Sequence, residues 1–178
     1  MPALPQPQPQ SARDIEAMRD LEARARLSAT TRLALGRSRI DGTGVFALAD
    51  MRADEVVGEY AGELVSDGEC ERRERAYERI GLADYMFRVA EAGAGCVVDA
   101  TLLGARTRYI NHSCEPSLYA VNTLAAGGAR RVFFYAARRI RRGEELSYDY
   151  SFPSDEAPIL CRCGAPTCRG TLNAAPES

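Results

Sequence analysis

The residues best suited to chemistry fall in three short strings in the second half of the chain. The first string contains Asn111, the single histidine His112 and Cys114. The second string contains Tyr148 and Tyr150. The third string is a cysteine cluster, Cys161-x-Cys163-x4-Cys168. Amide, imidazole, phenol and thiol groups bind polar ligands, exchange protons or hold metals, so these strings are the candidates for a functional site.

The lone histidine gives little support to the usual catalytic patterns. A single histidine is more often a packed core residue than a catalyst, and His112 has no second histidine with which to form a metal site. No serine or cysteine stands in a pattern typical of a triad with a base and an acid. The sequence therefore does not predict nucleophilic catalysis at His112.

The cysteine cluster has the spacing of a structural zinc site. Cys161, Cys163 and Cys168 supply three thiolates for a tetrahedral ion, and Cys114 is the natural fourth ligand. The sequence shows neither a secretory signal nor an apolar stretch of membrane-spanning length, so we expect a reducing compartment. In such a compartment cysteine clusters bind metal more often than they form disulfides. The competing interpretation is that the cysteines are unrelated free thiols.

The tyrosine string and a glycine turn are weaker signals when each is taken alone. Two tyrosines two positions apart on a strand point to the same face, and such aromatic pairs are common between strands. Gly42-Thr43-Gly44 falls between two predicted strands and lacks the third glycine and the helix of a dinucleotide fingerprint. By itself this segment predicts a turn where backbone can approach a ligand closely.

Composition limits the function classes. The chain of 178 residues is long enough for one domain with a core of its own and appendages. It carries 23 basic and 25 acidic residues without a block of one sign, which argues against nucleic-acid binding driven by bulk charge. All the basic residues are arginine, so the chain has no lysine side chain of its own to modify.

Two helices are predicted beside a mainly β domain. The Pro/Gln-rich residues 1–10 are expected to be disordered, and residues 11–31 predict a surface helix. Its apolar face would consist of Ile15, Met18, Leu21 and Ala25. A second helix begins after Ser66, with Glu69 completing a capping box, and ends at Gly81. Its apolar face would consist of Cys70, Tyr77 and Ile80.

Short strands are indicated where β-branched and aromatic residues gather between turn signals. They are predicted over residues 33–40, 45–48, 56–60, 85–89, 96–99, 119–124 and 131–136. Residues 125–128, Ala-Ala-Gly-Gly, predict a hairpin turn between the last two strands. Strands at this spacing with few helices favour a mainly β domain over a doubly wound parallel sheet.

Taken together and in this order, the strings resemble the SET-domain protein-lysine methyltransferases that carry a C-terminal post-SET segment. The resemblance covers roughly residues 33–173 and rests on residues 42–46, 59–62, 108–114, 148–152 and 161–173. Residues 84–89 and the closing Arg-Gly-Thr-Leu-Asn favour the trithorax and mixed-lineage-leukaemia branch, the histone H3 methyltransferases.

The resemblance implies small curved β-sheets around a threaded pseudoknot, an exception to the rule that chains do not thread. It divides the chain into successive segments: tail 1–10, helix 11–31, SET domain 32–152, linker 153–159, post-SET zinc segment 160–174 and tail 175–178. It also implies S-adenosylmethionine as cofactor and one structural zinc ion on the four cysteines named above.

Residue roles follow from the same resemblance. The cofactor would be held by Asp41, Gly42, Thr43, Gly44, Tyr85, Arg108, Asn111, His112 and Arg162, with Arg162 beside the adenine. Tyr85 would be the catalytic tyrosine, Tyr150 an aromatic wall, and Tyr148 the residue that limits the number of methyl groups. Because Tyr148 is not phenylalanine, we expect mainly monomethylation. Ser117, where relatives usually carry asparagine, and Thr43, where many carry a larger residue, affect the fine shape of the cofactor pocket and peptide groove.

The substrate implied is a protein with a lysine-containing tail, first of all histone H3 at its fourth residue, which would place the chain in the nucleus on chromatin. One alternative is a non-histone substrate, which would allow a cytoplasmic location. Another is an inactive SET fold that binds lysine tails, against which the intact Tyr85, Asn111, His112 and Tyr148 argue. Activating partner proteins are also expected, whereas direct nucleic-acid binding and a membrane are not.

Overall fold

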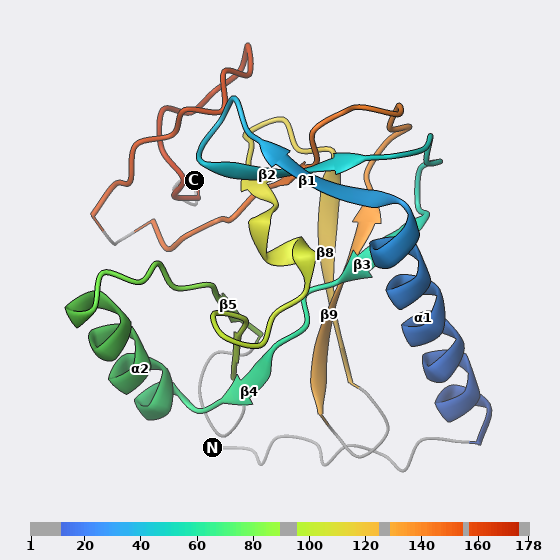
Figure 1. The fold of residues 1–178 in the computed structure, drawn as a ribbon, viewed down its shortest axis with the longest axis horizontal. Helices are drawn as coiled ribbons and strands as arrows, with labels where there is room; N and C mark the ends of the chain where they lie inside the picture. The colour runs from blue at the N-terminus through green and yellow to red at the C-terminus, as the bar shows by residue number, and fades with distance from the viewer. Residues whose placement is uncertain (1–11, 90–95, 125–128, 155–156, 175–178) are drawn as a thin grey trace.

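The computed structural model describes residues 12–89, 96–124, 129–154 and 157–174, and short strands make up most of its regular structure. In chain order the strands and one helical turn are β1 (Leu33–Arg37), β2 (Thr43–Ala47), β3 (Val56–Glu59), β4 (Glu63–Val65), β5 (Met86–Arg88), β6 (Val97–Asp99), η1 (Arg106–Tyr109), β7 (Asn111–His112), β8 (Leu118–Leu124), β9 (Arg130–Ala136) and β10 (Ser147–Tyr148). Helices α1 (Ala12–Thr31) and α2 (Asp67–Arg79) lie on opposite sides of the strands in Figure 1. The predicted mainly β class is confirmed.

Within the described residues the strands form four small sheets. The orders are β1-β2, β3-β9-β8 and β4-β6-β5, all antiparallel, and a parallel pair of β7 with β10. In that pair Ser147 lies opposite Asn111, and Tyr148 lies opposite His112. The histidine and tyrosine strings therefore lie side by side although they are far apart in the sequence.

The main core lies where the β1–β2 pair meets the sheet of β3, β9 and β8. Leu33, Val45, Phe134, Ile140 and Leu146 are fully buried in it. A buried aromatic ring such as that of Phe134 contributes about 3–5 kcal/mol relative to alanine. This packing fixes β9 and the segment leading to β10, so the tyrosine string starts from a rigid base.

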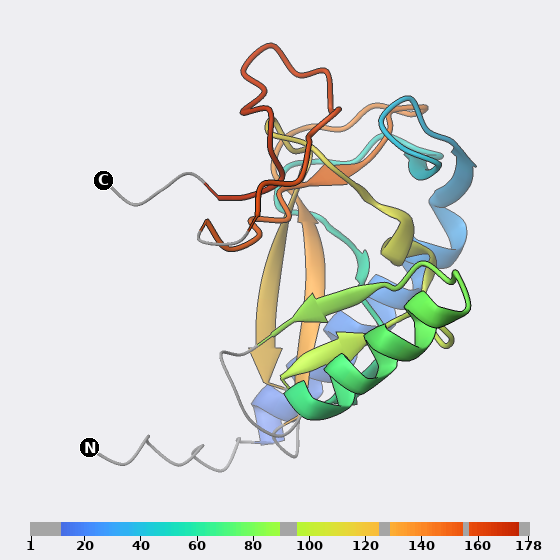
Figure 2. The same cartoon turned by 90° about the vertical axis from the view of Figure 1, so that its left-hand side faces the viewer.

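Helix α1 covers the outer side of β3 and β9 (Figures 1 and 2). Met18, Leu21 and Ala25 pack with Val56 and Phe133, which confirms the predicted apolar face at these three positions. The contact is reinforced by Arg131, whose guanidinium lies 2.6 Å from a carboxylate oxygen of Glu22 on α1 and 2.6 Å from one of Glu59 on β3.

Helix α2 begins after Ser66 as predicted, but the Glu69 carboxylate accepts from Arg72 and Arg73 and not from Ser66, so only half of the predicted capping box forms. The helix also presents a narrower apolar face than predicted. The Ser66 hydroxyl accepts a hydrogen bond from the Glu69 backbone N–H, which caps the first turn. Cys70 and Tyr77 are buried, whereas Ile80 is 74% exposed, so its predicted place in the apolar face is wrong. The helix ends at Arg79, and Gly81 continues the chain with φ +67, a left-handed conformation that suits glycine.

Several predicted boundaries differ from the structure. The strand predicted over residues 33–40 ends at Arg37 because the Ser38 hydroxyl accepts from the backbone N–H groups of Ile40 and Asp41. Such local bonds replace the strand ladder with a turn. The sequence also missed the short strands β4 and β7, and the strand expected to carry both tyrosines is limited to β10, which ends at Tyr148. The hairpin turn over residues 125–128 and the tails 1–10 and 175–178 lie outside the described residues.

In the part of the chain that the structure describes, no helix combines the length and the apolar character needed to span a membrane.

Candidate active site and metal centre

A cavity of about 820 Å³ is bounded by helix α2, strand β5 and the turn before β2. It is lined by eight of the predicted site residues: Asp41, Gly42, Thr43, Tyr85, Arg108, Asn111, Tyr148 and Tyr150. Gly44, His112 and Arg162 are not among the lining residues. His112 is buried, and Arg162 is exposed on the C-terminal segment. Most of the predicted site is therefore brought to one space, although its residues come from distant parts of the sequence.

The turn at the entrance to β2 is fixed by Asn111. The side-chain Nδ2 of Asn111 lies 3.0 Å from the carbonyl oxygen of Asp41 and 3.2 Å from that of Thr43. It also lies 3.2 Å from Oε1 of Glu145, which accepts a hydrogen bond from the Ser38 hydroxyl. The amide thus acts within the protein as a clamp that fixes the shape of the turn.

Glycine is favoured at position 44 because the carboxylate of Glu145 lies directly against it. A Cβ atom on Gly44 would overlap Oε1 of Glu145, whose position is set by Ser38 and Asn111. Gly44 therefore contributes to the cavity from behind the turn and not as part of its lining. Glu145 lies shortly before Tyr148 in the sequence, but its structural role was not predicted.

Tyr85 lies immediately before β5 and packs against a cation and a second ring. Its ring centroid is 5.2 Å from that of Tyr109, in an edge-on arrangement. The guanidinium carbon of Arg108 lies 5.4 Å from the Tyr85 centroid and 4.7 Å from the Tyr109 centroid, within range of cation–π attraction. Burial raises the pKa of Tyr85, and the charge of Arg108 only partly opposes this, so the hydroxyl is protonated at neutral pH.

Aromatic side chains form a continuous wall on another side of the cavity. Ring centroids are 5.1 Å apart for Tyr60 and Phe87, 5.9 Å for Phe87 and Tyr148, and 4.7 Å for Tyr148 and Tyr150. Burial raises the pKa values of Tyr60, Tyr148 and Tyr150, so all three phenols are neutral near pH 7. A group buried against this wall loses contact with water, and that loss of solvation disfavours its charged form.

His112 connects the aromatic wall to the cysteine cluster. Its Nδ1 accepts a hydrogen bond of 3.1 Å from the Tyr150 backbone N–H, and its Nε2 lies 3.4 Å from Sγ of Cys114. Burial lowers the pKa of His112, although the Asp149 carboxylate partly opposes this. Because Nδ1 accepts a hydrogen bond, the neutral ring carries its proton on Nε2 and donates toward the Cys114 sulfur.

The four predicted zinc ligands gather into one cluster. The Sγ atoms of Cys114, Cys161, Cys163 and Cys168 all lie within 4.8 Å of one another. Cys114 Sγ is 3.9 Å from Cys161 Sγ and 4.0 Å from Cys168 Sγ. Thiolates on one tetrahedral zinc, with bonds of about 2.3 Å, lie about 3.8 Å apart. The donor set and its spacing therefore fit one structural zinc ion.

Polar contacts attach the C-terminal segment to the domain beside the cysteine cluster. Figure 2 shows the path of this segment along the domain. Arg169 donates to both carboxylate oxygens of Asp149, at 2.7 and 2.8 Å. The Glu115 carboxylate accepts from the backbone N–H and the hydroxyl of Thr167, at 3.1 and 2.6 Å. Because Asp149 directly precedes Tyr150, the Arg169 contact ties the C-terminal segment to a residue next to the cavity wall.

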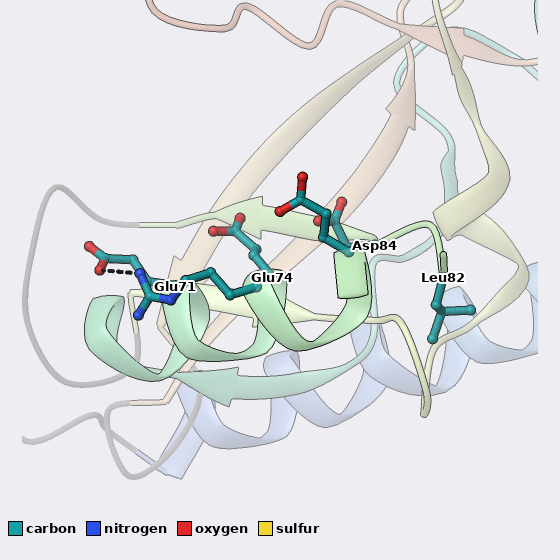
Figure 3. Close-up of a pocket in the computed structure, with 6 residues that line it drawn as sticks. Glu71, Glu74, Leu82 and Asp84 are labelled. Atoms are coloured by element: carbon teal, nitrogen blue, oxygen red, sulfur yellow. Dashed lines mark ion pairs between the residues drawn. The ribbon is translucent and has the colours of Figure 1, made fainter. Parts of the chain in front are cut away.

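A second, smaller hollow of about 470 Å³ lies along helix α2 next to the cavity (Figure 3). It is lined by Glu71, Glu74, Arg75, Glu78, Leu82 and Asp84. Glu74 and Asp84 also line the larger cavity, and Arg75 lies 3.6 Å from Glu71. Four carboxylates against one arginine make this approach to the cavity acidic.

The comparison with known families matches the model described as the SET domain to residues 42–151, which is more than half of the chain. The chain belongs to the SET-domain family. The predicted resemblance and fold class are thereby confirmed, and the cysteine cluster is consistent with a post-SET segment.

Relatives of this SET domain are known histone-lysine N-methyltransferases. It is 43% identical over 142 residues to set-2 of Caenorhabditis elegans, covering 79% of this chain and 9% of the relative. It is 44% identical over 143 residues to the H3 lysine-4 specific enzyme of Schizosaccharomyces pombe, covering 80% and 15%. It is 44% identical over 137 residues to trithorax of Drosophila virilis, covering 77% and 4%. The chain thus spans less than a sixth of the length of these relatives.

Proposed function

We propose that this SET domain transfers the methyl group of S-adenosylmethionine to the ε-amine of a lysine in another protein. One cavity supports this most directly. Tyr85, Tyr148 and Tyr150 form part of its lining, and the turn that Asn111 fixes forms another part. This arrangement offers one place for a polar cofactor and an aromatic place for an amine.

The residues present fit S-adenosylmethionine. The cavity volume lies within the range typical of small-molecule sites, and its lining combines the turn at residues 41–43 with the charged residue Arg108. When bound, this cofactor supplies a methyl carbon attached to a sulfonium cation. Asp41, Gly42 and Thr43 would hold one end of it, in a turn whose shape Asn111 maintains.

The aromatic wall would prepare the lysine amine. A free lysine has a pKa of about 10.4 and is almost entirely protonated at pH 7, whereas attack on a methyl carbon requires the neutral amine. Tyr60, Phe87 and Tyr148 replace water around the amine and so lower its pKa. Tyr85, whose own pKa is raised, would orient the amine through its hydroxyl without acting as a strong base.

The substrate we propose is the basic N-terminal tail of histone H3, modified mainly by one methyl group. The acidic approach formed by Glu74, Asp84 and their neighbours would attract a basic peptide. The fission yeast relative is named for H3 lysine-4, and the other relatives are named histone-lysine methyltransferases. A histone substrate would place the protein in the nucleus, where partner proteins would raise its activity.

Zinc has a structural role in this proposal. One ion on Cys114, Cys161, Cys163 and Cys168 would hold the C-terminal segment against the domain, because the energy of zinc binding is then part of the folding energy. Arg162 would reach the adenine from this segment.

Incubation with tritiated S-adenosylmethionine tests the proposed function. The purified chain is offered histone H3, the other core histones and a cell lysate, beside Tyr85→Phe. Tyr119→Phe is the matched control, because it removes an exposed tyrosine hydroxyl that donates to Asp54 and lies outside the cavity lining. Label on H3 that falls about 100-fold in Tyr85→Phe and persists in Tyr119→Phe supports the proposal.

Since the chain contains no lysine, labelled lysine cannot come from its own side chains. Label found only in lysate proteins would replace the histone by another substrate. Cofactor binding without transfer to any protein, with partner proteins present, would contradict the enzyme and indicate a lysine-binding module.

A further inference from the structure

A buried carboxylate outside the cavity lining connects helix α2 to Tyr85. The side chain of Asp99, at the end of β6, is 2% exposed. Its Oδ2 lies 2.9 Å from a guanidinium nitrogen of Arg73 and accepts a 2.9 Å hydrogen bond from the Tyr77 hydroxyl. Both donors belong to α2, so Oδ2 of Asp99 bonds to that helix twice.

The other oxygen of Asp99 connects through Thr101 to Tyr85. Oδ1 accepts a 2.9 Å hydrogen bond from the Thr101 backbone N–H. The Thr101 hydroxyl oxygen in turn accepts a 3.0 Å hydrogen bond from the Tyr85 backbone N–H. Burial raises the pKa of Asp99, but its bonds from Arg73, Thr101 and Tyr77 together hold the pKa below the ordinary value. The carboxylate is therefore ionised and each oxygen is a strong acceptor.

Tyr85 depends on this connection because it lies one residue before β5 begins. The ladder between β5 and β6 ends with Met86 opposite Asp99, one residue after Tyr85. From there a side-chain acceptor, Thr101, replaces the ladder, and the Ala100 N–H donates to the Tyr85 carbonyl oxygen at 2.9 Å. The Tyr85 backbone is thus fixed at both its polar groups by residues that follow Asp99 directly.

We propose that Asp99 is a positioning residue that sets the orientation of Tyr85 through Thr101 and couples it to helix α2. This inference rests on the proposed function, since it assigns the consequence of the coupling to methyl transfer. Helix α2 also provides Cys70 and Glu74 to the cavity lining, so a shift of the helix on substrate binding would reach Tyr85 through the same carboxylate. A misplacement of about 1 Å in such a group can cost up to 100-fold in rate.

Thr101 offers the sharpest test because two substitutions separate its hydroxyl from its packing. Thr101→Val keeps the shape and removes the acceptor for the Tyr85 N–H, whereas Thr101→Ser keeps the hydroxyl. We expect kcat for methyl transfer to fall roughly tenfold in Thr101→Val and to stay within about threefold in Thr101→Ser. The KM for the peptide and the Kd for the cofactor should change by less than about twofold in both. Equal loss in the two variants, or an unchanged kcat in Thr101→Val, would overturn the proposal.

The link to helix α2 is tested by a matched pair of tyrosines. Tyr77→Phe removes a hydroxyl that donates to Asp99, and Tyr119→Phe removes one that donates to Asp54 on an exposed surface. We expect kcat to fall about threefold in Tyr77→Phe and to be unchanged in Tyr119→Phe, at a temperature where both are folded. An unchanged kcat in Tyr77→Phe would show that α2 is not coupled to Tyr85.

Amide hydrogen exchange separates this proposal from the proposed function. The Tyr85 N–H should exchange at least about tenfold faster in Thr101→Val than in the wild-type chain or in Thr101→Ser, whether or not the protein transfers methyl groups. If the wild-type chain is inactive but this exchange pattern appears, the connection stands and the proposed function fails. If the wild-type chain is active and Tyr85 exchange is the same in all three, the positioning role is wrong.

Discussion

The rings of Tyr148 and Tyr150 lie 4.7 Å apart, centroid to centroid, with their planes inclined by 41°. The Tyr148 ring also lies 4.9 Å from that of Phe134, which is fully buried. The wall of the cavity is therefore continuous with the core, and the place of the Tyr148 hydroxyl is fixed by packing on both sides of its ring.

The first prediction concerns the number of methyl groups. Tyr148→Phe should raise the methylation degree from mainly mono- to di- and trimethyl-lysine, because the smaller wall leaves room for a methylated amine to rotate. The loss of one hydroxyl should cost about 1 kcal/mol of stability or less. Mass spectrometry of the product peptides measures the outcome. Mainly trimethyl-lysine from the wild-type chain would contradict the role given to Tyr148.

A second prediction concerns pH. The raised pKa of Tyr85 means that its phenol stays neutral from pH 6.5 to 8.5, so its protonation state does not change there. The rate should nevertheless rise about tenfold per pH unit while the lysine amine loses its proton. Initial rates at subsaturating peptide test this. Tyr85→Phe should be slower with the same slope, and a flat profile in that variant would make Tyr85 itself the titrating group.

The third prediction concerns zinc. The purified chain should contain one zinc ion, and a chelator should release the C-terminal segment and reduce activity at least about tenfold. Elemental analysis and limited proteolysis after residue 154 report the two effects. Cys168→Ser should lose the ion, whereas Cys96→Ala, which changes a buried cysteine outside the cluster, should keep it. Active protein without zinc would end this interpretation.

A fourth prediction concerns the turn before β2. Gly44→Ala should weaken cofactor binding about tenfold, because the added methyl group displaces Glu145 and with it the Asn111 amide. Gly68→Ala is the control. Its added Cβ meets open space in the first turn of α2, and alanine there should change stability by at most about 0.5 kcal/mol without affecting the cofactor. Calorimetric titration compares the two, and equal affinities would show that Glu145 moves freely.

The fold could be predicted where the pattern is local. β8 and β9 were predicted to within one residue at each end, since their β-branched and aromatic residues run through the whole strand. β7 and β10 contain two residues each and exist because Asn111 and Ser147 come together. No local pattern marks a strand that tertiary pairing creates.

In the candidate site, too, features with a local sequence pattern could be predicted and contacts between distant residues could not. The cysteine spacing predicted a cluster, and the structure places the four sulfurs together. The role of Glu145 depends on Ser38, which lies 107 residues away in the sequence, and that of Asp99 depends on Arg73, 26 residues away. The type of residue at these positions does not indicate such contacts. Arg162 is exposed and outside the cavity lining, so its predicted place beside the cofactor stays a prediction.

The parallel pairing of β7 with β10 also matters while the protein is being made. Asn111 and His112 leave the ribosome well before Ser147 and Tyr148, the residues beside which they lie in the finished fold. Until then the nascent chain lacks Glu145 behind the turn and the paired rings of Tyr148 and Tyr150, so the cavity is incomplete. We therefore expect a translation product that ends before β10 to lack the methyl-transfer activity proposed above.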